Sequence, residues 1–434
     1  MTFGMYNVDY EQRIYNPERM RKNRLERAHA ALKKHGLGSM LVYDYDTWRY
    51  LGYYTRHNYA RRRPGNFLLL IKDTGYPYGP KDQHYPTDET ELMPWFDGKL
   101  ILEKMYRYQA GAAMDPAYAA KKQLESAQEI LALLKKHGVQ DEPCGFDYAG
   151  CEIVDACRKV GINIVDGNRA TAEARMIKNE DEIECHRTAG AITEAAHWEL
   201  CRALKPGMTE WQMAGVISKA LYDHGAEELE GPSFVICTGP RSGHNVPAMP
   251  TDRIVRPGDM VIIDINGVSF QGYRTCFYRT YLVGDKPTEF QKNIYADCLA
   301  CQLAMQDSIK PGLTNHEITA NYMAKGNKPG LWGRPPKWPA PGKYFAAHGH
   351  QLGLDSGDPG PPWNTSHEPD QPALTIQENM VFAVEVGLYT WDGKNWAYDG
   401  VKLENTGVVR KDGWESFYRF PINDLIVCGL PGEY

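Results

Sequence analysis

The first part of the chain alternates between helical and extended patterns of apolar residues. Asn16, Pro17 and Glu18 are typical of a helix start, because Asn caps, Pro fits the first turn and Glu favours the helix dipole. We expect that helix to end near Gly36, followed by a strand over 38–48. Further on, the pattern predicts helices around 119–137 and over 153–160, and a strand over 162–167. Such alternation is typical of a small α/β domain.

The domain boundary is placed by a helix-start signal. Residues 179–182, Asn-Glu-Asp-Glu, resemble a capping box that opens a long helix. We therefore expect an amino-terminal α/β domain over 1–172 and a second domain over 173–434. In the second domain, Asn266-Gly267 is a two-residue hairpin signal, and 380–393 and 401–409 alternate as a pair of strands. The Pro/Gly/Trp-rich stretch 327–343 is expected to be a long surface loop.

The second domain contains an internal repeat. The segments that begin at Leu204 and Ile309 share the pattern apolar-Lys-Pro-Gly-apolar-Thr-x-x-Gln/Glu, 105 positions apart. Each copy is a turn followed by a capping box. A coincidence between two ordinary helix starts is the alternative, but a duplicated βα half explains the match better. A site between such halves would draw residues from both.

Composition excludes several classes of protein. The chain has 434 residues, 42% of them apolar and 24% charged, with a formal net charge of −6. These values fit a globular protein of two or three domains and argue against a generally basic surface for nucleic acid or anionic lipid. We find neither an apolar run long enough for a membrane span nor a secretory signal pattern, and ten cysteines are too few for a disulfide scaffold. We expect a cytoplasmic protein with no nucleic-acid or membrane partner.

Four residues stand out as candidates for chemistry. Glu385 lies between Val384 and Val386 in an apolar strand, Glu404 is placed similarly in 401–409, and Asp264 closes the apolar run 260–264. A buried carboxylate is costly unless it is paired, protonated or bound to metal. Each could be an ordinary salt-bridge or strand-end residue. Together with His350 they suit a divalent cation such as manganese, iron or zinc.

The motifs around these residues resemble a known superfamily. The segments are RPGDMVIIDING, GYRTCFYRT, HGHQLGLD, MVFAVEVGLY and GVKLENTGVV, in that order along the chain. They resemble the pita-bread superfamily of methionine aminopeptidase, Xaa-Pro aminopeptidase, prolidase and creatinase, over about 170–434. The segment 20–51 and the CTGPRS motif resemble the dimethylsulfoniopropionate-lyase members, next to the creatinase branch. The resemblance implies an α+β fold: a pita-bread domain with pseudo-twofold βα halves, preceded by a smaller α/β domain.

The resemblance also implies two metals held by two Asp, one His and two Glu. His350, Glu385 and Glu404 match the His and both Glu, and Asp264 falls at or near the first Asp. The second Asp is replaced by Cys276. A thiolate cannot bridge two hard ions as a carboxylate does, so a dinuclear site is disfavoured.

Two alternatives for the metal then remain open. One softer ion, iron or zinc, would be held by ligands from this set, or the site would hold no metal and use acid–base chemistry, as in creatinases. Cys276 could equally be a small residue that fills the place of a lost ligand. Asn266 would replace the second Asp of the Asp-x-Asp pattern in the lyase members. The five candidate ligands are Asp264, Cys276, His350, Glu385 and Glu404.

The resemblance assigns further roles. His244 corresponds to the His placed over the substrate, so the expected catalytic residues are His244, Glu385 and Glu404. The second peptidase His is replaced by Gly357. In creatinase-like homodimers an Arg from the amino-terminal domain grips a substrate carboxylate in the partner's site, and Arg62 is the nearest match. A solvated basic face is the alternative; the candidate substrate-binding residues are His57, Arg61, Arg62 and Arg63.

Three functions follow from these patterns. The one we expect is a homodimeric lyase or hydrolase that cleaves a C–S or C–N bond in a small carboxylate-bearing substrate, with a single-metal or metal-free site. The alternative is an Xaa-Pro dipeptidase or aminopeptidase, which the broad pattern favours and Cys276, Asn266 and Gly357 oppose. A non-catalytic binding protein on the same scaffold is the third, opposed by retention of the His and Glu residues.

Overall fold

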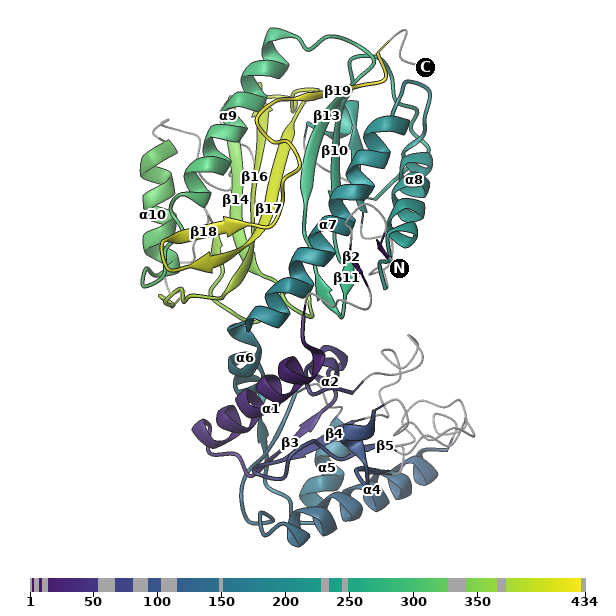
Figure 1. The fold of residues 1–434 in the computed structure, drawn as a ribbon, viewed down its shortest axis with the longest axis vertical. Coiled ribbons are helices and arrows are strands. Elements are labelled where there is room, and N and C mark those ends of the chain that lie inside the picture. The colour runs from purple at the N-terminus through teal and green to yellow at the C-terminus, as the bar shows by residue number, and fades with distance from the viewer. Residues whose placement is uncertain are drawn as a thin grey trace. The chain divides into compact units, whose positions relative to one another are not determined.

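The computed structural model describes the chain in segments that together form two compact units (Figure 1). The described residues are 2–3, 8–9, 15–53, 67–80, 93–102, 115–147, 151–227, 234–243, 249–326, 341–364 and 372–430. The smaller unit is Pro17–Arg175, and the larger comprises Met1–Asn16 with Met176–Tyr434. The division falls inside helix α6 (Asn168–Met176), three residues after the expected boundary. None of the described helices is both long and apolar enough to cross a membrane.

The smaller unit is built on a four-stranded sheet in the order β4-β3-β7-β8, in which β4 is antiparallel and the other strands are parallel. Leu41, Leu69 and Ile71 from the sheet pack with Ile130 and Leu134 of α4 in one core. The described elements, α6 apart, are α1 Pro17–Lys34, β3 Ser39–Val42, α2 Tyr45–Tyr50, β4 Leu68–Ile71, β5 Gly79–Pro80, the 3₁₀ turn Pro94–Phe96, β6 Leu100–Leu102, α4 Pro116–Lys136, β7 Cys144–Phe146, α5 Cys151–Lys159 and β8 Ile164–Asp166.

The expected strand over 38–48 is wrong beyond Val42. Asp44 caps a helix there, because its carboxylate accepts a hydrogen bond from the backbone N of Thr47 at 2.9 Å. Helix α2 therefore begins at Tyr45, and Trp48 lies on a helix. A local capping interaction outweighs the extended tendency of the preceding apolar run.

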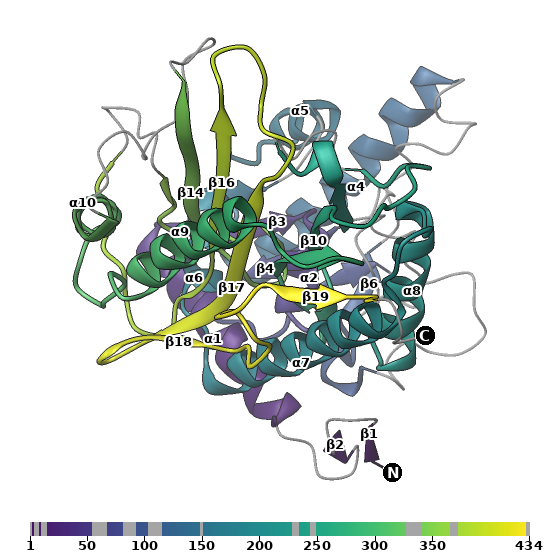
Figure 2. The same ribbon diagram turned by 90° about the horizontal axis from the view of Figure 1, so that it is seen from above.

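The larger unit contains two mainly antiparallel sheets, each accompanied by a helix pair (Figures 1 and 2). One sheet has the order β19-β13-β10-β9 and the other β15-β14-β16-β17-β18. Figure 2 shows α9 lying across β16 and β17. The elements are β1 Thr2–Phe3, β2 Val8–Asp9, α7 Glu180–Ala203, α8 Glu210–Asp223, β9 Phe234–Thr238, the 3₁₀ turn Gly239–Arg241, β10 Met260–Ile265, β11 Ser269–Phe270, β12 Tyr273–Arg274, β13 Tyr278–Val283, α9 Glu289–Gln306, α10 Asn315–Gly326, β14 Gly342–Gln351, β15 Trp363–Asn364, β16 Val381–Trp391, β17 Val401–Arg410, β18 Gly413–Ser416 and β19 Ile426–Cys428.

The two halves of this unit repeat the same local structure. Thr209 forms a capping box with Gln212 at the start of α8, and Thr314 exchanges the same hydrogen bonds with Glu317 at the start of α10. Each Thr also forms an isolated bridge to a later segment, Thr209 with Ile254 and Thr314 with Thr375. The α+β class and the duplicated halves predicted from the sequence are thus present in the structure.

One hairpin differs from expectation. The tight turn lies at Gln271-Gly272, between the paired strands β11 and β12, and not at Asn266-Gly267. Gln271 and Gly272 have φ of 53° and 83°, the left-handed values that a two-residue hairpin turn requires. Asn266 instead lies just past β10, where its side chain belongs to the polar cluster described below.

Candidate metal site

Three strands bring the carboxylates and imidazoles of the larger unit together. Glu385 on β16 lies directly opposite Glu404 on β17, and His348 on β14 lies opposite Glu385 from the other side. Val384 and Val386 pack into the apolar core, so alternation turns Glu385 to the opposite face, as the sequence predicts. His350 follows His348 by two residues and lies on the same face of β14.

The other sheet supplies Asp264 on β10, and Cys276 lies between β12 and β13. Side chains join the two sheets. The Thr280 hydroxyl on β13 donates to the Lys402 carbonyl at 2.8 Å and accepts from the Lys402 N–H at 2.9 Å. The Thr406 hydroxyl donates to the Cys276 carbonyl at 2.7 Å. We call this junction of side-chain hydrogen bonds the β13–β17 seam. It fixes Cys276 beside Glu404, although β13 and β17 are not paired by a backbone hydrogen-bond ladder.

The seam also contains a buried cation. Arg279 is 1% exposed, its Nη1 donates to the Glu404 carbonyl at 2.7 Å, and its guanidinium carbon lies 4.0 Å from the centre of the Phe277 ring. Burial lowers the pKa of Arg279 to about 10, which leaves it charged at neutral pH. The Arg279 side chain therefore holds the backbone at Glu404 in place.

Cys276, His350 and Glu404 form a group with the spacing of metal ligands. One candidate ligand atom from each of the three lies within 4.8 Å of the others. Glu404 is fully buried, and neither of its carboxylate oxygens has a hydrogen bond of standard geometry from the described residues. Nε2 of His350 lies 3.8 Å from Oε1 of Glu404. A buried carboxylate without hydrogen bonds is costly, so these residues fit a bound cation.

Asn266 links Asp264 to Cys276. Its amide nitrogen donates to Oδ2 of Asp264, and its amide oxygen accepts from the Cys276 thiol. Asp264 is fully buried, and its Oδ1 lacks a hydrogen-bond partner of standard geometry among the described residues. Asp264 and Asn266 thus both belong to the cluster, and the amide takes a connecting role between two candidate ligands.

Glu385 differs from Glu404 because His348 and Lys402 both contact its carboxylate. Nε2 of His348 contacts Oε1 of Glu385, and the Lys402 ammonium lies 2.5 Å from Oε2 as an ion pair rather than as a hydrogen bond of standard geometry. Burial raises the pKa of Glu385, but the positive charge of Lys402 and the contact with His348 outweigh it and set the pKa below its usual value.

The pKa values of the remaining acids of the cluster are raised rather than lowered. Burial, with the nearby charge of Glu385, raises the pKa of Asp264 to about 8, although Lys402 opposes this shift. Burial and the charge of Glu385 also raise the pKa of Glu404 well above its usual value. Burial and the charge of Glu404 raise the pKa of the Cys276 thiol. Carboxylates whose pKa values are pushed apart are typical of functional sites.

Sequence reasoning missed His348 and Lys402. Both lie two residues before a predicted ligand, His348 before His350 and Lys402 before Glu404, and period-2 alternation on a strand places such pairs on one face. The segments HGH at 348–350 and KLE at 402–404 therefore contained the signal that both side chains of each pair face the site. The partner of each side chain, Glu385, lies on a different strand, so the sequence alone does not reveal the contact.

Several predicted residues lie outside the described part of the chain. These are His244 within 244–248 and the basic group within 54–66, namely His57, Arg61, Arg62 and Arg63. Their roles remain predictions, as does the homodimer. Gly357, which replaces the second peptidase His, lies beside Asp358, whose carboxylate forms a buried ion pair with Lys178 at 3.0 Å.

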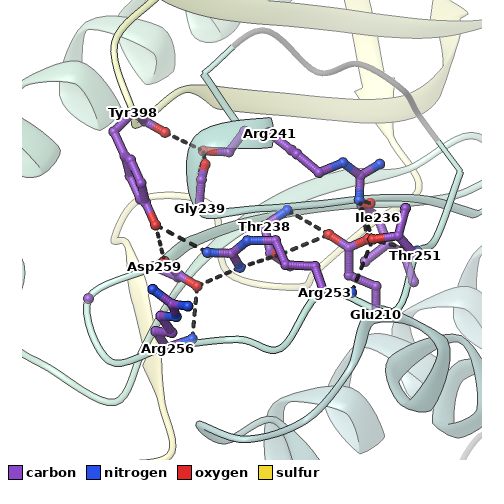
Figure 3. A network of polar contacts seen from close by, with 12 residues as sticks. Glu210, Ile236, Thr238, Gly239, Arg241, Thr251, Arg253, Arg256, Asp259 and Tyr398 are labelled. Atoms are coloured by element: carbon purple, nitrogen blue, oxygen red, sulfur yellow. Dashed lines mark hydrogen bonds and ion pairs between the residues drawn. The ribbon is translucent and has the colours of Figure 1, made fainter.

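A polar network, drawn in Figure 3, joins residues that precede and follow 244–248 in the sequence, the stretch that contains His244. Glu210 is fully buried and accepts hydrogen bonds from Thr238 on β9 and from Thr251, which flank 244–248 on either side. Arg241 pairs with the same carboxylate and donates to the Met249 carbonyl at 2.8 Å. One buried carboxylate thus holds both flanks of the segment.

Sequence comparisons agree with this architecture. Residues 184–411 match metallopeptidase family M24. A probable dipeptidase PepE of Mycobacterium tuberculosis is 30% identical over 257 residues, which are 58% of this chain and 61% of that protein. An Xaa-Pro dipeptidase of Pyrococcus horikoshii is 31% identical over 249 residues, covering 56% and 62%. The match thus spans less than two thirds of either relative.

Solved structures share the fold over nearly the whole chain. An Xaa-Pro dipeptidase from Bacillus anthracis matches with a TM-score of 0.69 and 19% identity, covering 94% of this chain and 99% of that one. An X-Pro aminopeptidase from Thermotoga maritima matches with a TM-score of 0.66 and 19% identity, covering 93% and 99%. The relatives found by sequence, both named as dipeptidases, favour the peptidase alternative over placement beside the creatinases and sulfonium lyases. The chain belongs to metallopeptidase family M24 and has the pita-bread fold of that family.

Proposed function

We propose that the protein is a metal-dependent hydrolase that cleaves dipeptides or short peptides of the Xaa-Pro type. The observation that carries this proposal is the buried Glu404 carboxylate, without standard hydrogen bonds of its own, beside Cys276 and His350. Membership in a metallopeptidase family, and the peptidase names of its relatives, support the same reaction class.

The donor set indicates which metal would fit. Cys276, His350 and Glu404 offer one sulfur, one nitrogen and oxygen, a mixture that suits zinc or iron better than manganese or magnesium. Asp264 offers Oδ1 as a further oxygen. A divalent ion bound there would polarise the scissile carbonyl and lower the pKa of a water molecule.

The chain's own residues then supply proton handling. The His348 side chain is 42% exposed, whereas Glu385 is buried beneath it, so the imidazole connects the buried carboxylate to solvent. Lys402 keeps Glu385 ionised, which makes it a weak base but an acceptor that orients the His348 imidazole. His348 itself would take a proton from the attacking water and pass it on to solvent or to the leaving amine.

Metal content and dipeptide hydrolysis test this function together. We expect purified protein to retain zinc or iron, to hydrolyse Ala-Pro or Gly-Pro, and to lose both properties in Glu404→Gln. Glu378→Gln is the matched control, because Glu378 is an exposed carboxylate in the turn before β16. A metal-loaded, folded protein with no turnover across a panel of Xaa-Pro and other dipeptides would refute the proposal.

A second candidate is cleavage of a C–S or C–N bond in a small carboxylate-bearing molecule. The thiol of Cys276 and the amide of Asn266 favour it, because they replace the second acidic ligand that a dinuclear peptidase needs. Release of a thioether or amine from an onium or guanidino carboxylate, without dipeptide turnover, would support this candidate over the first.

A further inference from the structure

A lysine ammonium occupies the middle of the acidic cluster. Nζ of Lys402 lies 2.5 Å from Oε2 of Glu385 and 3.8 Å from the centre of the Tyr278 ring. The Lys402 side chain is only 11% exposed. Tyr278 lies opposite Asp264 in the β10–β13 ladder, so the ammonium lies among residues of both sheets.

The fold fixes this lysine at both ends. Its backbone N–H and carbonyl are both bound by the Thr280 hydroxyl across the seam. In the β16–β17 ladder its partner is Gly387, where a Cβ would come within 2.6 Å of the Tyr389 hydroxyl. The backbone of Lys402 is therefore fixed on both sides, and its ammonium is placed by the ion pair with Glu385 and the face of the Tyr278 ring.

Because of the ammonium, the carboxylates of Glu385 and Glu404 differ in which partners they contact. Both oxygens of Glu385 are engaged, one by Lys402 and one by His348, whereas both oxygens of Glu404 are without standard hydrogen bonds from the described residues. A second divalent ion on Glu385 would lie only a few ångströms from the ammonium. At that separation, repulsion would weaken its binding at least about a thousandfold.

We infer that Lys402 is a built-in cation of the centre, which neutralises Glu385 and leaves one divalent ion to Cys276, His350 and Glu404. One divalent ion and the ammonium together offset three of the four formal negative charges that Asp264, Glu385, Glu404 and a ligating Cys276 thiolate would carry. The inference rests on the proposed metal dependence. In it, the Lys402 ammonium takes the place of the second metal of a dinuclear centre.

Zinc stoichiometry of lysine variants tests the inference. After chelation and dialysis, calorimetric titration and elemental analysis should give one zinc per chain for the wild type. Lys402→Met keeps the apolar stem and removes the charge, so it should bind a second zinc, with the affinity of that second site raised at least about a thousandfold. Lys402→Arg, which keeps the charge, is the matched control and should remain at one.

Two results would overturn the inference: two zinc ions in the wild type, or one in a Lys402→Met protein that unfolds cooperatively. A cobalt titration of the wild type covers the case in which Lys402→Met does not fold. The sulfur-to-cobalt charge-transfer band from Cys276 and the d–d bands should saturate together at one equivalent; d–d bands that keep growing to a second equivalent would contradict the inference. One equivalent without dipeptide turnover would refute the proposed function alone.

Discussion

Replacing Glu210 with Gln should destabilise the larger unit strongly. The Glu210 carboxylate accepts hydrogen bonds from five donors: the N–H and hydroxyl of Thr238, the N–H and hydroxyl of Thr251, and Nη1 of Arg241. Gln keeps the shape but has one oxygen and one NH₂ group. In either orientation the NH₂ group faces a buried backbone N–H, of Thr238 or of Thr251, which then has no acceptor.

The size of the stability loss in Glu210→Gln follows from the loss of a buried charge and of at least one hydrogen-bond acceptor. Removing one partner of a buried ion pair typically costs about 3–5 kcal/mol, and we expect the lower end because Gln retains one oxygen. At about 2–4 °C per kcal/mol, the unfolding midpoint of the larger unit should fall by roughly 6–12 °C. Differential scanning calorimetry would measure this shift.

Glu289→Gln is the matched control for this experiment. Glu289 pairs with Lys292 on the surface of α9, and its side chain is 82% exposed. Its replacement should change stability by no more than about 0.5 kcal/mol. If Glu210→Gln unfolded within that same range of the wild type, the buried network of Figure 3 would not be the structural anchor that its hydrogen bonds indicate.

Three further predictions concern pH and metal binding. Burial lowers the pKa of His186 to about 3, so below pH 6.5 the unfolded state binds a proton that the folded state does not. The free energy of unfolding, measured by urea titration, should therefore fall by roughly 1.5–2 kcal/mol from pH 6.5 to pH 5. The same pH dependence in His186→Gln would contradict this prediction. Cys276→Asp should raise affinity for Mn²⁺ relative to Zn²⁺ at least about tenfold in competition titrations, and an unchanged ratio would show that the thiol is not a ligand. Glu404→Gln should weaken zinc binding at least about tenfold by calorimetry, whereas unchanged affinity would remove Glu404 from the ligand set.

Local signals in the sequence predicted local structure well. The capping boxes at Asn179, Thr209 and Thr314 open helices α7, α8 and α10, because a cap involves residues only three positions apart. The alternation around Glu385 correctly turns it away from the apolar core. The strand over 38–48 and the hairpin at 266–267 failed because competing local signals, the Asp44 cap and the Gln271-Gly272 turn, were stronger.

The limits of the prediction lie in contacts between strands. His350, Glu404 and Cys276 were identified as candidate ligands, and the structure brings them together. The pairing of Lys402 with Glu385 depends on which strands become neighbours, and no spacing in the sequence encodes that. The placement beside lyases rested on two short segments, 20–51 in the smaller domain and CTGPRS at 237–242 in the larger one, whereas the match to family M24 extends over 184–411 and contains the candidate site.

The β13–β17 seam has a consequence for how such a centre can change during evolution. A backbone ladder fixes the spacing of two strands whatever their side chains, but this junction depends on individual groups such as the Thr280 hydroxyl and the Arg279 guanidinium. A single exchange at one of them would alter the separation of the two sheets, and with it the size of ion that fits, without touching any ligand. Metal preference could therefore drift through positions that a comparison of ligands alone would overlook.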